Sequence, residues 1–284
     1  TENNKKTIYL DVFKSKLKIS LIAGAVSPDI SFLKNTLLAN TRYELTTAIL
    51  NKSGSFYSPQ PKTNFIEETD IFIFINFPTQ ATPGNLIKQI AGKAEKKQSP
   101  VLYFEGPNID RTKLLLLENY LPFRANFKQV LEKNIHAEMS QTGALHPILK
   151  FNQHSDTPSG YSLSDLPPVY SSINDVKPWP NSKVLAFSAQ NLLQTASSPE
   201  NKNPFLLTRN NQNQKSATIF AYGLWKWALL LADRNLDFSP YNALMNNLIR
   251  WLEPDNSGER LHVELDKSNF NLAEKIKANI ELFD

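Results

Sequence analysis

The sequence predicts an α/β fold built on a doubly wound, mainly parallel β-sheet. Residues 17–24 form a short apolar run that ends at Gly24, and an amphipathic segment over 28–38 follows, which is the pattern of strand, turn and helix. Residues 70–77 are almost continuously apolar, as in a central strand that is covered on both faces. Within about the first 105 residues, four predicted strands, each followed by a connection, recur at roughly 25–30 residue spacing, which is typical of βαβ units.

The first unit has clear boundary signals. Pro28 lacks the N–H that a first-turn position would leave unpaired, and the oxygens of Ser27 and Asp29 can accept from the next free amides. We therefore expect a helix from 28 to 38. In parallel sheets ligands lie at the carboxyl ends of the strands, so strand-end residues such as these two are candidates for ligand binding.

Further elements follow in order along the chain. We expect strands at 43–50, 100–105, 183–188, 204–208 and 217–222, with a hairpin turn at 210–215, and helices at 83–97 and 110–120. Residues 223–231 and 240–252 fit two helices or one interrupted helix. Residues 127–139 fit either a helix or an extended segment. Residues 141–180 are rich in Pro, Ser, Asp and Asn, which predicts a long connection with little regular structure.

The two ends of the chain differ from the middle. Residues 1–16 are a lead-in strand or linker, and residues 17–254 form the α/β domain. Apolar residues alternate in two stretches of 255–284, with a turn at 266–269, which predicts the first hairpin of a following β-sandwich. Because a lone hairpin is marginal in water, we expect the sequence to be a piece of a longer chain.

Composition excludes several classes of function. Of 284 residues, 41% are hydrophobic and 20% charged, as in a soluble globular protein, and the +4 charge is dispersed, which argues against a nucleic-acid partner. The apolar run 228–232 is too short to cross a bilayer, so we expect no direct membrane insertion of this fragment. The sequence has no cysteine, which excludes thiolate chemistry and fits an extracytoplasmic protein slightly better than a cytosolic one.

Cofactor and metal motifs are missing. The turn after the first strand has one glycine where a dinucleotide site needs three, and no phosphate-binding Gly-rich loop occurs, so we expect no cofactor. His136-Ala137-Glu138 resembles part of a zinc-deaminase motif, but that chemistry needs two cysteines. His146 and His154 could approach Asp156, although surface histidines are the more frequent explanation of such a pattern, and we expect no metal.

Two stretches carry the remaining candidates. Glu105 ends a central strand, where it could act as a general acid or base or simply pair with a neighbouring loop. In a helix, Trp225 and Trp227 point to different sides, so at least one belongs to the core, and the other could stack on a sugar. The candidate ligand-binding residues are Ser27, Asp29, Glu105, Asn108 and Trp225, and no catalytic residue is assigned.

Several stretches in order carry a family resemblance. They are residues 17–38, 70–78, 99–108, 145–149, 166–169, 221–230 and 248–254. Through them the chain resembles the class I glutamine amidotransferase-like superfamily, which implies a flavodoxin-like α/β fold. More narrowly, it is similar to the glutamine amidotransferase-type domains of large bacterial membrane-anchored proteins, which implies a periplasmic domain beside β-sandwich modules, tethered by regions outside this sequence.

The resemblance also implies a catalytic triad that this chain lacks. In active members a cysteine lies at the sharp turn after a central strand, with a histidine and an acidic partner later. Here the comparable turn is Phe104-Glu105-Gly106, and after His154 the one histidine is His262, within the expected hairpin. We therefore interpret the chain as a catalytically inactive binding or scaffolding module of an envelope protein, whose partners are other domains of the same chain. The alternatives are a glycan-binding or small-metabolite-binding protein, a hydrolase using residues around Glu105, and an assembly surface.

Overall fold

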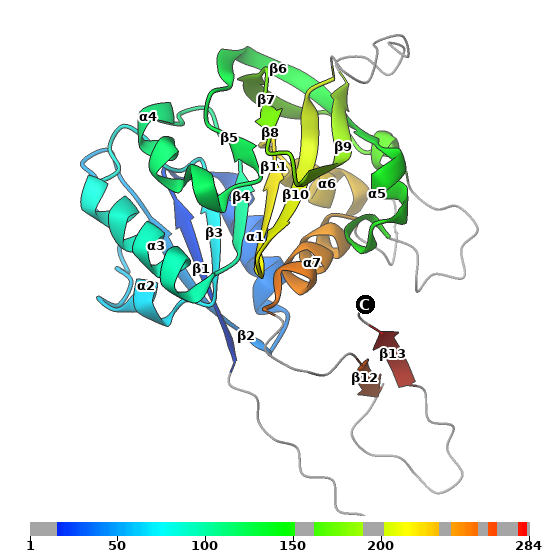
Figure 1. The fold of residues 1–284 in the computed structure, drawn as a ribbon, viewed down its shortest axis with the longest axis horizontal. Coiled ribbons are helices and arrows are strands. Elements are labelled where there is room, and N and C mark those ends of the chain that lie inside the picture. Colours follow the sequence, from blue (N-terminus) through cyan, green and yellow to red (C-terminus); the bar gives the residue numbers. More distant parts are fainter. Residues whose placement is uncertain are drawn as a thin grey trace, which may run out of the picture. The chain divides into compact units, whose positions relative to one another are not determined.

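The computed structural model describes residues 16–150, 162–189, 202–232, 240–254, 261–265 and 278–282. The chain divides into two compact units, Thr1–Glu253 and Pro254–Asp284. The first unit contains a nine-stranded sheet in the order β2-β1-β3-β4-β11-β10-β9-β6-β7 (Figure 1). Residues 1–15, for which a lead-in strand is predicted, lie outside the described residues.

One half of the sheet is parallel. Its strands are β2 (Tyr43–Ile49), β1 (Leu17–Ala23), β3 (Ile71–Ile75), β4 (Val101–Phe104) and β11 (Gln214–Ile219). The predicted strands at 17–24, 70–77 and 100–105 therefore do lie side by side. All five residues of β3 are buried, as its continuous apolar run predicts for a strand between two layers.

Helices cover both faces of this parallel half. Alternate residues of β3 pack into two separate cores: Ile73 contributes to one and Phe72 to the other. The first core includes α1 (Pro28–Leu38), α6 (Trp225–Ala232) and α7 (Pro240–Leu252), and the second includes α2 (Phe65–Glu68), α3 (Gly84–Lys97), α4 (Arg111–Leu114) and the 3-10 helix η1 (Leu115–Tyr120). The doubly wound fold is confirmed.

The parallel strands follow the order 2-1-3-4-5 along the sheet, because β11 is the fifth of them in the chain. This is the strand order of flavodoxin-like folds. The start of α1 also agrees with the sequence: Pro28 occupies the first turn, and the Ser27 hydroxyl oxygen accepts a hydrogen bond from the Asp29 N–H at 3.2 Å.

The other half of the sheet is antiparallel. It consists of β10 (Pro204–Asn211), β9 (Ser182–Ala189), β6 (Lys128–Met139) and β7 (Val169–Asn174). The hairpin between β10 and β11 turns on Gln212 and Asn213, both with positive φ, so the turn is tighter than the predicted 210–215. The segment 127–139, for which helix and extended structure were both open, is strand β6.

The prediction of little regular structure over 141–180 was wrong for 141–150 and 162–180, and 151–161 lie outside the described residues. This segment contains α5 (Gln141–Leu145), η2 (Pro147–Leu149), η3 (Leu163–Asp165), β7 and β8 (Lys177–Pro178), which pairs with β5 (Phe123–Arg124). Strand β7 owes its structure to its partners, since it pairs with β6 along one side. On the other side Tyr170 and Tyr222 exchange two backbone hydrogen bonds of 2.9 Å, which join β7 to the chain just beyond β11.

The second unit contains an antiparallel pair, β12 (Leu261–Leu265) and β13 (Ala278–Leu282). This agrees with the hairpin that the alternating residues predict, and the β-sandwich beyond it stays a prediction. Among the described residues, no helix combines the length and the apolar character needed to span a membrane.

Candidate ligand-binding cleft

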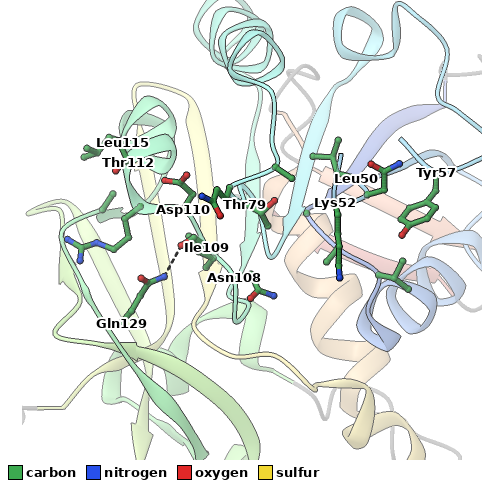
Figure 2. A pocket seen from close by; sticks show the side chains of 18 residues that line it. Leu50, Lys52, Tyr57, Thr79, Asn108, Ile109, Asp110, Thr112, Leu115 and Gln129 are labelled. Carbon is green, nitrogen blue, oxygen red and sulfur yellow. Dashed lines mark hydrogen bonds between the residues drawn. The ribbon is translucent and has the colours of Figure 1, made fainter. Parts of the chain in front are cut away.

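A cleft of about 1250 Å³ lies where β1, β2, β3 and β4 end (Figure 2). This is the edge at which flavodoxin-like sheets bind their ligands. The residues that line it come from the loops after these strands, from α4 and η1, and from β6 and the segment before it: Gly24, Ala25, Val26, Leu50, Asn51, Lys52, Tyr57, Thr79, Gln80, Ala81, Asn108, Ile109, Asp110, Arg111, Thr112, Leu115, Ala125 and Gln129.

Asn76 holds the loops together beside the cleft. It directly follows β3 in the left-handed region, with φ of 49°, which asparagine tolerates better than most residues. Its Oδ1 accepts a hydrogen bond from the Asn108 N–H at 2.9 Å. A Cβ on Gly24 would lie 2.1 Å from the Asn76 carbonyl oxygen, and one on Gly106 would lie 2.3 Å from its Cβ. Only glycine fits at these two positions, so three strand ends converge on one asparagine.

The Lys113 ammonium fixes one wall of the cleft. Its Nζ donates to the carbonyl oxygens of Gln80 and Thr82 at 2.5 and 2.8 Å, and lies 3.5 Å from that of Thr79. These contacts join the loop after β3 to α4, the helix that follows β4. A charged donor makes such hydrogen bonds stronger than neutral ones.

Two more contacts extend the same wall. The Asp110 carboxylate accepts from the Lys113 N–H at 3.1 Å and so caps α4. On β6 the Gln129 side chain donates to the Ile109 carbonyl oxygen at 2.7 Å (Figure 2). The wall is thereby tied to both halves of the sheet.

The opposite wall comes from the tight turn after β2. The Asn51 Oδ1 accepts from the N–H groups of Ser53 and Ser55 at 2.9 and 3.2 Å, and the Tyr57 N–H donates to the Ile49 carbonyl oxygen at 2.9 Å. Lys52 sits in this turn with an exposed side chain. Figure 2 shows Lys52 and Tyr57 on this wall, across the cleft from Thr112, Leu115 and Gln129. Both walls are preformed by hydrogen bonds within the chain.

Positive charge and apolar side chains face the cleft together. Lys52 and Arg111 are exposed, and among the described lining residues Asp110 carries the one carboxylate. The Arg111 guanidinium carbon lies 5.6 Å from the centre of the Phe127 ring. The apolar members include Val26, Leu115 and Tyr57, which are 69%, 55% and 48% exposed.

Of the five predicted ligand-binding residues, Asn108 lines the cleft. Ser27 caps α1. Asp29 is buried, and its carboxylate accepts from the N–H groups of Gly223 and Trp225 at 2.7 and 2.9 Å, which joins the start of α1 to that of α6. Burial raises the pKa of Asp29, and these hydrogen bonds oppose the rise. The ring of Trp225 lies 6.4 Å from that of Phe32.

Glu105, the fifth, is fully buried and faces β7 rather than the cleft. Its carboxyl oxygens accept hydrogen bonds from the Ser171 hydroxyl at 2.8 Å and from the N–H and hydroxyl of Ser172. Burial raises the pKa of Glu105 to about 7, while the hydrogen bonds from both serines and the charge of Lys133 oppose the rise. Pairing of Glu105 with a neighbouring loop is one expectation from the sequence, whereas the partners observed here belong to strand β7. Ligand binding by Ser27, Asp29, Glu105, Asn108 and Trp225 stays a prediction.

The other sequence candidates occupy structural positions. Trp227 is fully buried, its ring stacks on Phe205, and its Nε1 donates to the Pro167 carbonyl oxygen at 2.7 Å, which confirms that one of the two tryptophans is core. His146 accepts from the Ile148 N–H at 3.4 Å through Nδ1. His154 and Asp156 lie outside the described residues, among which no group of three metal-ligating side chains occurs.

Sequence reasoning missed Asn76, Lys113, Lys52 and Gln129. A signal existed for Asn76, because a polar residue that directly follows an apolar central strand lies at the ligand-binding edge. Lys113 and Lys52 are ordinary surface lysines by pattern. Gln129 lies in the segment for which helix and extended structure were both open, so its place beside Ile109 depends on tertiary structure.

No family model and no curated protein matches the sequence. Solved structures similar to this chain include a ThuA-like protein from Parabacteroides merdae, at 11% identity and TM-score 0.47, with 84% of this chain and 90% of that chain covered. PurLQS from Thermotoga maritima matches at 11% identity and TM-score 0.45, covering 84% and 99%. A GMP synthase subunit from Thermoplasma acidophilum matches at 7% identity and TM-score 0.41, covering 84% and 94%. At these identities the likeness concerns the fold alone, and the strand order by itself assigns the chain a flavodoxin-like, doubly wound α/β fold.

Proposed function

We propose that this chain is a non-catalytic binding module of the glutamine amidotransferase-like type, and that its ligand occupies the cleft at the carboxyl edge of the parallel sheet. One observation carries the proposal. A preformed cleft of about 1250 Å³ lies at this edge, while the nearby strand-end carboxyl group, that of Glu105, is buried against Ser171 and Ser172.

The residues of the cleft support binding rather than catalysis. The sequence contains no cysteine, and the described lining residues include no histidine. Asp110 already accepts the Lys113 N–H as a helix cap. Nucleophilic catalysis needs a nucleophile beside a base, and these lining residues offer no such pair. A hydrolase built around Glu105 would require its carboxyl group to leave both serines.

The proposal extends to the setting of the module. We place it in a larger extracytoplasmic protein that regions outside this sequence tether to the membrane, with other domains of the same chain as partners. The lack of cysteine and the pair of strands at 261–265 and 278–282 support this setting. Digestion of the full-length protein by protease added to spheroplasts, whose inner membrane is intact, tests this setting, and full protection would refute it.

Two measurements on the purified chain test the function. We expect no glutaminase turnover above that of a buffer blank, and turnover would refute the non-catalytic assignment. In a calorimetric screen of sugars, metabolites and peptides, we expect at least one ligand whose binding is lost in Ala25→Trp, which fills the cleft with an indole ring. Lys34→Trp is the matched control, because Lys34 is an exposed residue of α1 outside the lining.

A further inference from the structure

We infer that the ligand of the cleft is an acidic peptide segment that also carries apolar side chains. The inference rests on the proposed function and adds the chemistry of the ligand. It combines three properties of the cleft: the charge of its two walls, the apolar side chains at its surface, and its size.

The first property is an excess of positive charge. Lys52 belongs to the turn after β2, and Arg111 begins α4 on the opposite wall. Asp110, which caps α4, carries the one carboxylate among the described lining residues. The lining therefore holds two exposed basic side chains against one carboxylate, and this excess of positive charge favours acidic groups and speeds their arrival.

The positions of the two cations set a requirement on the ligand. Because Lys52 and Arg111 come from opposite walls, one small acidic group pairs with only one of them. A neutral sugar forms an ion pair with neither. A chain with acidic groups at separate positions can satisfy both walls at once.

The second property is apolar surface beside the charges. Val26, Tyr57 and Leu115 line the cleft and are 48–69% exposed. These side chains come from both walls, and exposed apolar side chains that line one concave surface mark interaction sites more often than scattered ones do. A ligand that covers them carries apolar side chains between its acidic groups, as an acidic amphipathic peptide does.

The third property is size. Pockets for small ligands measure roughly 300–1000 Å³, and this cleft, at about 1250 Å³, is larger. Its walls are held by Asn76, Lys113 and Gln129 through contacts within the chain. A peptide of several residues fits a cleft of this volume, and a preformed site lowers the ordering cost of binding it.

The experiment uses the full chain and two fluorescein-labelled hexapeptides, followed by fluorescence anisotropy. One peptide alternates glutamate with leucine and ends in phenylalanine, and the other replaces each glutamate by glutamine. We expect the acidic peptide to bind at least about tenfold more tightly, since it gains two ion pairs of modest strength. Raising the salt concentration weakens its binding, because exposed charges are screened.

Charge-matched variants locate the effect. Lys52→Gln combined with Arg111→Gln is expected to weaken the acidic peptide about 25-fold, at about fivefold for each lost ion pair. Lys96→Gln combined with Lys97→Gln removes the same charge from the exposed end of α3, away from the lining, and is expected to change the affinity less than twofold. Thermal melting of each variant confirms that it is folded.

The outcomes separate the inference from the proposed function. Equal affinity for both peptides, or equal loss in the two double variants, refutes the acidic peptide. A neutral sugar, or the uncharged peptide, that binds more tightly than the acidic peptide and whose binding Ala25→Trp abolishes also refutes it, but leaves the cleft as the binding site. If neither peptide nor any other ligand responds to Ala25→Trp, both the inference and the proposed function fail.

Discussion

The buried carboxyl group of Glu105 should make the stability of this protein fall as the pH rises toward neutrality. In the folded chain its pKa is about 7, against an ordinary value of 4.5. The folded state therefore holds the proton more tightly than the unfolded state does. Stability from this group is fully present below about pH 4.5 and is lost as the pH rises through 7.

The size of the effect follows from the shift. The rise of the Glu105 pKa from 4.5 to about 7 means that ionising this group lowers the free energy of unfolding by roughly 3 kcal/mol. Because the side chain is completely buried, solvent screens this value little. Glu105→Gln keeps the shape and the neutral charge, so it should remove the pH dependence while retaining a hydrogen-bond acceptor for Ser171 or Ser172.

The assay is urea unfolding of the wild type and of Glu105→Gln at several pH values from 4.5 to 8. The difference in free energy of unfolding between them is the relevant quantity, because other titrating groups then cancel. We expect the variant to gain relative stability as the pH rises through 7. Parallel pH profiles for the two proteins would show that the burial of Glu105 does not govern its protonation. Glu105→Ala, which leaves both serines without this partner, should lower stability by about 2–4 kcal/mol at pH 4.5. Because alanine also removes the titrating carboxyl group, this difference should shrink as the pH rises to 8.

Four further predictions concern other named contacts. Asn76→Ala should be less stable than Asn76→Gly by about 1 kcal/mol in urea unfolding, because alanine resists the left-handed backbone at this position, and equal stabilities would contradict this. Lys113→Met should speed hydrogen exchange over 79–82 and lower the free energy of unfolding by about 1–3 kcal/mol, since three carbonyl oxygens lose a charged donor. Unchanged exchange would show that the Lys113 ammonium does not hold this loop in place. Burial lowers the pKa of His146 to about 4, so the neutral imidazole stabilises the folded state above pH 6.5, and this stability is lost as the pH falls through 4. In urea unfolding, the free energy of unfolding of His146→Asn should therefore fall less steeply with decreasing pH than that of the wild type. Asp29→Asn should lower the melting temperature. The amide oxygen can accept from one of the N–H groups of Gly223 and Trp225, but the amide NH2 then faces the other N–H group, which loses its acceptor.

The parallel half of the fold could be predicted because its signals are local. Strands such as β3 are buried on both faces, so their residues are apolar without interruption, and α1 carries its own cap. Strand β6 gave no such signal: residues 128–132 are all exposed, so the alternation of a half-buried strand is missing there. Strand β7 could not be found in a proline-rich segment, because its partners, β6 and Glu105, are distant in sequence.

The location of the candidate site could be predicted from the sequence, but most of the residues that line it could not. The rule that parallel sheets bind at their carboxyl edge gives the location, and Asn108 follows from it. Glu105 satisfied the same rule, yet the direction in which its side chain points depends on β7, which the sequence did not reveal. Lys52 and Gln129 reach the cleft from a turn and from an antiparallel strand, where no periodic pattern identifies them.

The position of the Lys113 ammonium among three carbonyl oxygens has a practical consequence for work on this protein. Converging carbonyl oxygens of this kind are a common coordination shell for a sodium or potassium ion that a protein binds. Here the chain supplies the positive charge through a covalent stem, so the charge cannot be dialysed away or exchanged. The wall that it holds should therefore keep one shape in sodium, in potassium and in the presence of chelators, so affinities measured in sodium and in potassium buffers of equal ionic strength can be compared directly.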